Sequence, residues 1–195
     1  MHHVRAASQL PAPRGVFHAK LGLMSVAEPR RIVLFRHAKA DWPQVSDHER
    51  PLAERGRKDA AVAGRKLADT GIPFDLALCS TATRNRETWK LAVQEFPHRP
   101  KTVYEERLYE ASPGELIAVL NETPDDVRSA LLIGHNPGVQ GLADILAGQS
   151  EGDARERMSS RDFPTAAFAV LNFSSSWKAL EPGLGTLLDY WAPTE

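Results

Sequence analysis

The segment Ile-Val-Leu-Phe-Arg-His, residues 32–37, places two basic side chains directly after a continuous apolar run. An apolar run without alternation is typical of a strand that is covered on both faces of a sheet. Two similar runs follow at residues 74–78 and 130–133, and longer helical patterns separate the three. This alternation of strands and helices predicts an α/β fold.

The remaining elements follow from apolar periodicity and turn residues. Gly71 and Pro97 mark the ends of the first two helices. Helices are expected over residues 53–70, 83–96, 113–120 and 137–147, and further strands over residues 102–104, 166–173 and 186–190. Residues 148–161 are polar, and we expect them to form a mobile loop.

The composition indicates a soluble, globular protein. Its 195 residues suffice for one domain with a substantial core. Lys and Arg number 24 against 25 Asp and Glu, so the formal net charge of −1 gives no general attraction to nucleic acid or to a membrane. No apolar run approaches the roughly 18–20 residues of a membrane span. We therefore expect a cytoplasmic protein.

The N-terminal residues differ from the rest of the chain. Residues 1–27 contain no Asp or Glu and carry three scattered basic residues among Pro, Ala and Gly. We expect residues 1–28 to be a disordered tail and residues 29–195 to form the single domain. Met24 is an alternative natural start of the chain, and a transit peptide is the weaker alternative.

Polar side chains follow three of the predicted strands. Arg36-His37 follows the first strand, residues 80–84 (Ser-Thr-Ala-Thr-Arg) follow the second, and Gly134-His135 follows the strand at 130–133. Ligands bind outside the carboxyl ends of strands in open parallel sheets, so these three motifs are expected to meet in one pocket. Two Arg, two His, a Ser and helix-start amides suit a dianionic phosphoryl group.

These residue types support phosphoryl transfer without a metal. A neutral imidazole can attack phosphorus and form a phosphohistidine intermediate. Guanidinium groups match phosphate oxygens, and they stabilise the charge on the transferred group. Taken singly, each residue also has an ordinary structural interpretation: Ser80, for example, is well placed to cap the next helix.

Four motifs in this order carry a resemblance to a known family: Leu34-Phe35-Arg36-His37-Ala38-Lys39, Arg50-Pro51-Leu52 with Arg55-Gly56, Ser80-Thr81-Ala82-Thr83-Arg84 with Glu87-Thr88, and Gly134-His135-Asn136-Pro137. They resemble the histidine phosphatase (phosphoglycerate mutase-like) superfamily and, within it, the small SixA-type phosphohistidine phosphatases. The likeness runs from about residue 31 to residue 191. It implies that residues 29–195 are a histidine phosphatase domain, a three-layer sandwich with a mostly parallel central sheet flanked by helices.

The resemblance also implies roles for individual residues. His37 would be the nucleophile, and Arg36, Arg84 and His135 would form the rest of the phosphate pocket. Arg50 would lie at the edge of this pocket. No metal and no organic cofactor is implied.

The general acid is less well defined. Larger relatives use a Glu in a Leu-x-Glu setting, which Leu108-Tyr109-Glu110 resembles, so Glu110 is the first candidate. Asp41 is the second candidate, and water is the third. Each carboxylate also has a structural interpretation, Glu110 in a solvated loop and Asp41 in a turn.

The spacing between Arg84 and His135 bears on the substrate. Only about fifty residues separate them, which leaves little chain for a lid and predicts a shallow, open site. Such a site suits a phosphohistidine on a protein surface. The alternatives are a small-metabolite phosphatase or mutase, and a non-catalytic module that only binds phosphate.

Two other hydrolase classes fit less well. A cysteine-dependent phosphatase needs an Arg six positions after its nucleophile, but Asn85 holds that place after Cys79, the one cysteine. A zinc hydrolase needs clustered ligands, and His37 and His135 have no other His beside them.

Overall fold

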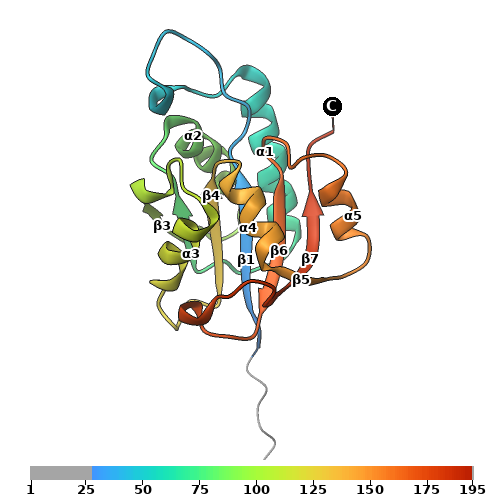
Figure 1. Ribbon diagram of the computed structural model, residues 1–195. Helices are drawn as coiled ribbons and strands as arrows, with labels where there is room; N and C mark the ends of the chain where they lie inside the picture. The colour runs from blue at the N-terminus through green and yellow to red at the C-terminus, as the bar shows by residue number, and fades with distance from the viewer. Residues whose placement is uncertain (1–27, 195) are drawn as a thin grey trace, which may run out of the picture.

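The computed structural model describes residues 28–194, and the N-terminal tail predicted for residues 1–28 lies almost entirely outside them. Seven strands of this part form one sheet in the order β3-β2-β4-β1-β6-β7-β5 (Figure 1). Their bounds are β1 Arg30–Arg36, β2 Leu76–Cys79, β3 Lys101–Tyr104, β4 Ser129–Gly134, β5 Ala147–Ser150, β6 Phe168–Phe173 and β7 Gly185–Trp191. The sheet is mixed and mostly parallel.

Four strands, β3, β2, β4 and β1, run parallel and form one half of the sheet. In the register, Arg36 at the end of β1 lies opposite Gly134 at the end of β4, and Cys79 at the end of β2 lies opposite Ile133. The three strands therefore end at the same level, at the upper edge of the sheet in Figure 1. The segments that carry the predicted motifs leave the sheet side by side.

The other half of the sheet changes direction. β6 is antiparallel to both β1 and β7, whereas β5 runs parallel to β7. The loop predicted for residues 148–161 is wrong, since this segment contains most of β5 and the helix α5 (Ala154–Ser159). β5 forms through backbone pairing with β7, and α5 buries only Ala154 and Met158. Neither element has an apolar pattern strong enough to identify it.

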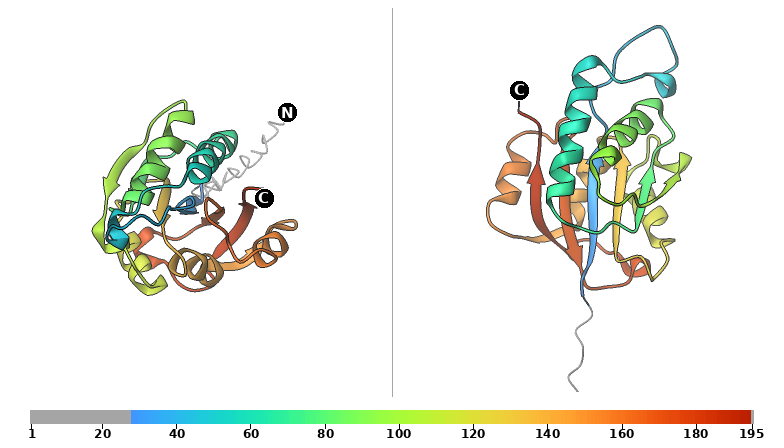
Figure 2. Two further views of the ribbon diagram at one scale, coloured as in Figure 1. Left: turned by 90° about the horizontal axis from the view of Figure 1, so that it is seen from above. Right: turned by 180° about the vertical axis from the view of Figure 1, so that it is seen from behind.

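Helices cover both faces of the sheet (Figure 2). α1 (Glu54–Asp69) and α2 (Thr83–Ala92) lie on one face, and α3 (Pro113–Asn121), α4 (Gly138–Leu146) and α5 lie on the other. Short 3-10 turns η1 to η4 span Asp47–Glu49, Val93–Glu95, Glu106–Leu108 and Trp177–Ala179. The predicted three-layer α/β sandwich is confirmed.

Alternate residues of β1 enter two separate cores, as the pleat of a strand requires. Ile32 and Leu34 pack with α3 and α4, while Val33 and Phe35 pack with α1 and α2. All four side chains are fully buried. This double coverage explains why the sequence shows a continuous apolar run there rather than an alternating one.

One glycine fixes the position of α2. A side-chain carbon at Gly64 of α1 would lie 2.4 Å from the carbonyl oxygen of Ala92 in α2. Only glycine allows the two helices to approach this closely. The contact matters for the site, because α2 carries Arg84 at its N-terminal end.

No helix in residues 28–194 combines the length and the apolar character that crossing a membrane requires.

Candidate active site

Two histidines meet where β1 and β4 end. The ring centroids of His37 and His135 are 5.2 Å apart, and both side chains are buried. The backbone N–H of His37 donates to the carbonyl of Gly134 at 3.1 Å, which ties the two segments together. The Arg36-His37 and Gly134-His135 motifs therefore lie side by side, as the sequence predicts.

The ring of His37 has a defined orientation and tautomer. Its Nδ1 lies 2.7 Å from the carbonyl oxygen of Ala38, which can only accept a hydrogen bond. Nδ1 therefore carries the proton, and Nε2 keeps its lone pair. Nε of Arg84 donates toward this Nε2 at 3.4 Å. The unprotonated nitrogen thus points into the region that the basic side chains surround.

The electrostatics of the site keep His37 neutral. Burial lowers the pKa of His37 to about 3, and the charges of Arg84 and Arg36 act in the same direction against the opposing effect of the Ala38 hydrogen bond. The imidazole is consequently unprotonated at neutral pH, which is the form that can act as a nucleophile.

Arg84 is the centre of the hydrogen-bond network. Its guanidinium is buried, with Nη2 lying 3.4 Å from Nδ1 of His135. Thr88, one turn later in α2, donates to the carbonyl of Arg84 and accepts from the N–H of Ala38. Thr88 therefore couples the helix that carries Arg84 to the segment that carries His37.

His135 is held from behind by Ser80. Nε2 of His135 lies 2.8 Å from Oγ of Ser80, which also accepts from the N–H of Ala82 at 3.3 Å. Ser80 therefore contacts the site, but it does not cap α2, because the N-cap residue is Ala82 and no side chain accepts from the first turn of the helix. Burial, followed by the charge of Arg84, lowers the pKa of His135 to about 3.

Within residues 28–194, neither Arg36 nor Arg50 forms a hydrogen bond to His37 or His135. Nη1 of Arg36 donates to the carbonyl of Phe163 at 2.9 Å, and its buried Nε has no hydrogen-bond partner in the described residues. Arg50 stacks on the exposed ring of Trp42, with 3.2 Å between the guanidinium carbon and the ring centroid. Arg50 also donates to Asp47 at 3.1 Å, so it contacts the site through that carboxylate.

Asp47 and Tyr109 belong to the site, and the sequence analysis missed both. The carbonyl and Oδ2 of Asp47 accept from Arg84 at 2.7 and 3.1 Å, and the hydroxyl of Tyr109 donates to Oδ2 at 2.5 Å. This Tyr109 bond, together with Arg50 and Arg84, holds the pKa of Asp47 well below its usual range. Asp47 is therefore an anion on the guanidinium that the sequence assigns to phosphate.

A cavity of about 480 Å³ opens over these residues. His37, Asp47, Arg84, Glu110 and His135 line it. Glu110 is exposed and adopts a left-handed backbone conformation with φ of 56°. Asp41 does not line this cavity; its Oδ1 accepts from the N–H of Trp42 at 2.9 Å.

The wall that carries Glu110 is brought close by a glycine. A side-chain carbon at Gly138, the first residue of α4, would lie 2.3 Å from the carbonyl oxygen of Ala111. The loop before α3 can therefore pack against the start of α4, directly after Asn136-Pro137. Within residues 28–194, no group of three His, Cys, Asp or Glu side chains is arranged to hold a metal ion.

Comparison with known proteins agrees with this geometry. Residues 32–162 match the family model of the histidine phosphatase superfamily, branch 1. The chain belongs to this superfamily. The resemblance carried by the four sequence motifs is confirmed, and the matched residues include His37, Arg84 and His135.

Individual members of the superfamily are also similar to this chain. An uncharacterized protein of Mycobacterium tuberculosis is 42% identical over 161 residues, covering 81% of this chain and 99% of the relative. The solved structure assigned as phosphohistidine phosphatase SixA from Nakamurella multipartitia has a TM-score of 0.76 at 29% identity, over 87% of this chain and 99% of that one. A crystal structure from Agrobacterium tumefaciens that is likewise assigned as phosphohistidine phosphatase SixA gives a TM-score of 0.69 at 29% identity, over 85% of this chain and 99% of that one.

Proposed function

We propose that this histidine phosphatase superfamily member hydrolyses phosphoryl groups through a phosphohistidine intermediate on His37. The observation that carries the proposal is the orientation of the His37 ring. Its Nδ1 is bound to the Ala38 carbonyl, while the free Nε2 faces Arg84 in a cavity shared with His135.

In the first step, the phosphoryl dianion enters the cavity beside Arg84 and His135, and Arg36, which does not line the cavity, adds its positive charge. Nε2 of His37 attacks phosphorus in line, a P–N bond forms, and the bond from phosphorus to the leaving group breaks. Arg84 has to exchange its bonds to Asp47 for bonds to phosphoryl oxygens. Positioning by all three groups and electrostatic stabilisation by the two guanidinium groups supply most of the catalysis.

In the second step, a water molecule attacks the phosphorus of phosphorylated His37. The P–N bond breaks, the electron pair returns to Nε2, and inorganic phosphate leaves. A carboxylate at the cavity can accept the proton that the water releases. Neutral His37 is regenerated for the next turnover.

Glu110 is the better of the two carboxylates for protonating the leaving group. It lines the cavity, whereas Asp41 lies outside it and accepts a hydrogen bond from the N–H of Trp42. Asp47 also lines the cavity, but its lowered pKa keeps it ionised, so it has no proton to donate. Water remains the third candidate.

We propose a phosphohistidine on a protein surface as the substrate. Between Arg84 and His135 the chain adds only the rest of α2, the strands β3 and β4, the helix α3 and two short 3-10 turns, so little of it can cover the cavity. The P–N bond of phosphohistidine also needs less help from a strong acid than a phosphate ester does. The similarity at 29% identity to structures assigned as phosphohistidine phosphatases supports the same choice.

A comparison of substrates tests this proposal. Hydrolysis by the purified protein is measured separately for a phosphotransfer protein phosphorylated on histidine and for each of a panel of sugar phosphates and nucleotides. We expect kcat/KM to be highest for the phosphoprotein and unchanged by a chelator. Preferential hydrolysis of one small phosphate would favour a small-metabolite phosphatase or mutase, and tight binding without turnover would favour a phosphate-binding module.

A further inference from the structure

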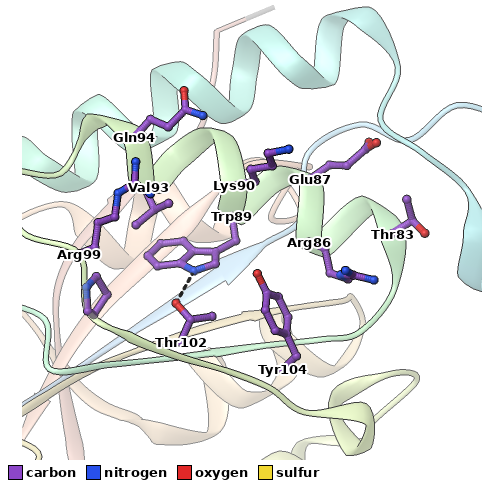
Figure 3. A pocket seen from close by; sticks show the side chains of 11 residues that line it. Thr83, Arg86, Glu87, Trp89, Lys90, Val93, Gln94, Arg99, Thr102 and Tyr104 are labelled. Atoms are coloured by element: carbon purple, nitrogen blue, oxygen red, sulfur yellow. Dashed lines mark hydrogen bonds between the residues drawn. The ribbon is translucent and has the colours of Figure 1, made fainter.

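A second concave surface lies on α2 and β3, outside the residues proposed for catalysis (Figure 3). Its volume is about 560 Å³, larger than that of the cavity over the histidines. The indole of Trp89 forms its floor and donates to Oγ1 of Thr102 at 2.9 Å. We call this surface the α2–β3 groove, and the residues used below to define it are Thr83, Arg86, Lys90, Arg99, Thr102 and Tyr104.

The α2–β3 groove carries an excess of positive charge. Arg86 and Lys90 lie one turn apart on the same face of α2, and Arg99 lies just before β3. All three are exposed, and none forms an ion pair within residues 28–194. Like charges at this helical spacing destabilise a helix, so the fold itself gains nothing from the arrangement.

The acid in the wall of the groove does not neutralise these cations. Glu87 is the one acidic residue among those that line it, and Oε2 of Glu87 accepts from the backbone N–H of Leu52 at 2.6 Å. That hydrogen bond directs the carboxylate toward the segment before α1. The groove therefore presents three cations in a chain whose formal net charge is −1.

The groove also borders an open edge of the sheet. β3 is the last strand at this end, and within the described part of the chain it pairs only with β2. An edge strand exposes backbone N–H and C=O groups that can bind an extended peptide. Tyr104 is half exposed and places its ring beneath Arg86, 5.5 Å from the guanidinium carbon, which adds an apolar surface for a side chain of such a peptide.

One end of the groove lies close to the proposed active site. Arg84 and Arg86 are two residues apart on α2, but Arg84 is buried beside His37 and Arg86 faces the groove. From Thr83 to Gln94 a helix rises roughly 16 Å, which is about five residues of extended chain. A peptide bound along the groove can therefore reach the cavity over His37 with its next residues.

We propose that the α2–β3 groove binds an acidic, extended segment of the phosphoprotein substrate while its phosphohistidine occupies the cavity over His37. The proposal rests on the phosphatase function proposed above. Charge complementarity selects the acidic segment. The N-terminal residues of this chain do not have that complementarity, because residues 1–27 contain three basic and no acidic side chains.

Two synthetic peptides test the proposal. Both carry one phosphohistidine and a short Gly-Ser spacer, followed by five Glu in the acidic peptide or five Gln in the neutral one. We expect the KM of the acidic peptide to be about tenfold lower at low ionic strength, and the difference to shrink at high salt. Equal KM values for the two peptides would overturn the docking proposal and leave the phosphatase function intact.

Charge variants show whether the groove is responsible. The measured quantity is the KM of the neutral peptide divided by the KM of the acidic peptide. The triple variant R86E/K90E/R99E should bring this ratio down to one, and R86Q/K90Q/R99Q should lower it part of the way. The control R31E/K58E/K178E makes the same change in net charge at exposed cations outside the groove and should keep the ratio. An equal loss of preference in the control would overturn the proposal in favour of a general charge effect.

Two further measurements separate the other outcomes. If the protein hydrolyses neither peptide nor p-nitrophenyl phosphate, the proposed function fails, and fluorescence anisotropy of the unphosphorylated five-Glu peptide still tests the groove. Binding that R86E/K90E/R99E abolishes would support the groove, and no binding would overturn it. A dimer in sedimentation that only the groove variant dissociates would overturn it in favour of self-association.

Discussion

The parallel and antiparallel halves of the sheet contribute differently to the candidate site. β1, β2 and β4 end together, and each is followed by a side chain of the candidate site: His37, Ser80 or His135. β6 runs the other way, so the segment before it meets the site with its backbone instead. The carbonyl of Phe163 accepts from Arg36, and the N–H of Ala166 donates to the carbonyl of His37.

This difference shows where the residues of a binding site concentrate in such a sheet. Helix starts and polar side chains concentrate at one edge only where several strands end in the same direction. The antiparallel half instead supports this edge through backbone hydrogen bonds and buried aromatic side chains. Substitutions at the ends of the parallel strands should therefore change turnover, and core substitutions in the other half should change stability.

The largest effect is expected for His37→Asn. Asparagine can keep a hydrogen bond to the Ala38 carbonyl but has no nucleophilic nitrogen, so kcat/KM on a phosphohistidine peptide should fall roughly 10⁴-fold or more. Steady-state kinetics give this value, and urea unfolding checks that the variant is folded. Turnover within tenfold of the native rate would contradict the assignment.

Arg84→Ala should have the next largest effect on turnover. Removing a preorganised donor to the transition state costs about 10²–10³ in kcat. Arg65→Ala is the matched control, because Arg65 forms an ion pair with Glu95 and does not line the cavity over the histidines. Equal kcat values for the two variants would contradict the assignment of Arg84 to the phosphate pocket.

Trp177→Ala tests the connection between β6 and β7. Trp177 lies in η4 on this connection, is fully buried, stacks edge-on against Phe173 at 4.9 Å and donates to the Val127 carbonyl at 2.8 Å. The free energy of unfolding should fall by about 3–5 kcal/mol, with kcat of the folded fraction unchanged. Trp42→Ala, at a tryptophan that is 79% exposed, should change it by less than about 0.5 kcal/mol. A Trp177→Phe variant covers the case in which alanine prevents folding.

The pH dependence of stability gives the smallest effect. His37 has a pKa of about 3 in the folded protein and 6.5 when unfolded, so the unfolded chain binds more protons between these values. Stability should therefore fall as the pH drops below 6.5. Between pH 7 and pH 5, urea unfolding should show the native protein losing about 2 kcal/mol more than His37→Asn. Parallel curves of stability against pH for the native protein and His37→Asn would contradict the lowered pKa of His37.

The sequence predicted the parallel half well because its signals are local. In residues 32–37 the buried strand and the polar residues that follow it are contiguous, so one segment indicates both the fold and the site. β5 and α5 give no comparable signal, since one depends on pairing with β7 and the other buries two side chains.

Asp47 and Tyr109 illustrate what local patterns cannot predict. They are 62 residues apart and come together only through the fold. Tyr109 lies within the Leu108-Tyr109-Glu110 stretch that identified Glu110, and Asp47 lies three residues before Arg50. Neither position carries a spacing that points to Arg84, so contact with its guanidinium could not be inferred.

Trapping the intermediate tests the central claim most directly. Native protein and His37→Asn are mixed with a peptide carrying ³²P-labelled phosphohistidine, quenched in alkali and separated from the peptide. We predict alkali-stable, acid-labile label on the native protein alone, mapping to the peptide that contains His37. Turnover by the native protein without such label, or equal label on both proteins, would contradict His37 as the nucleophile.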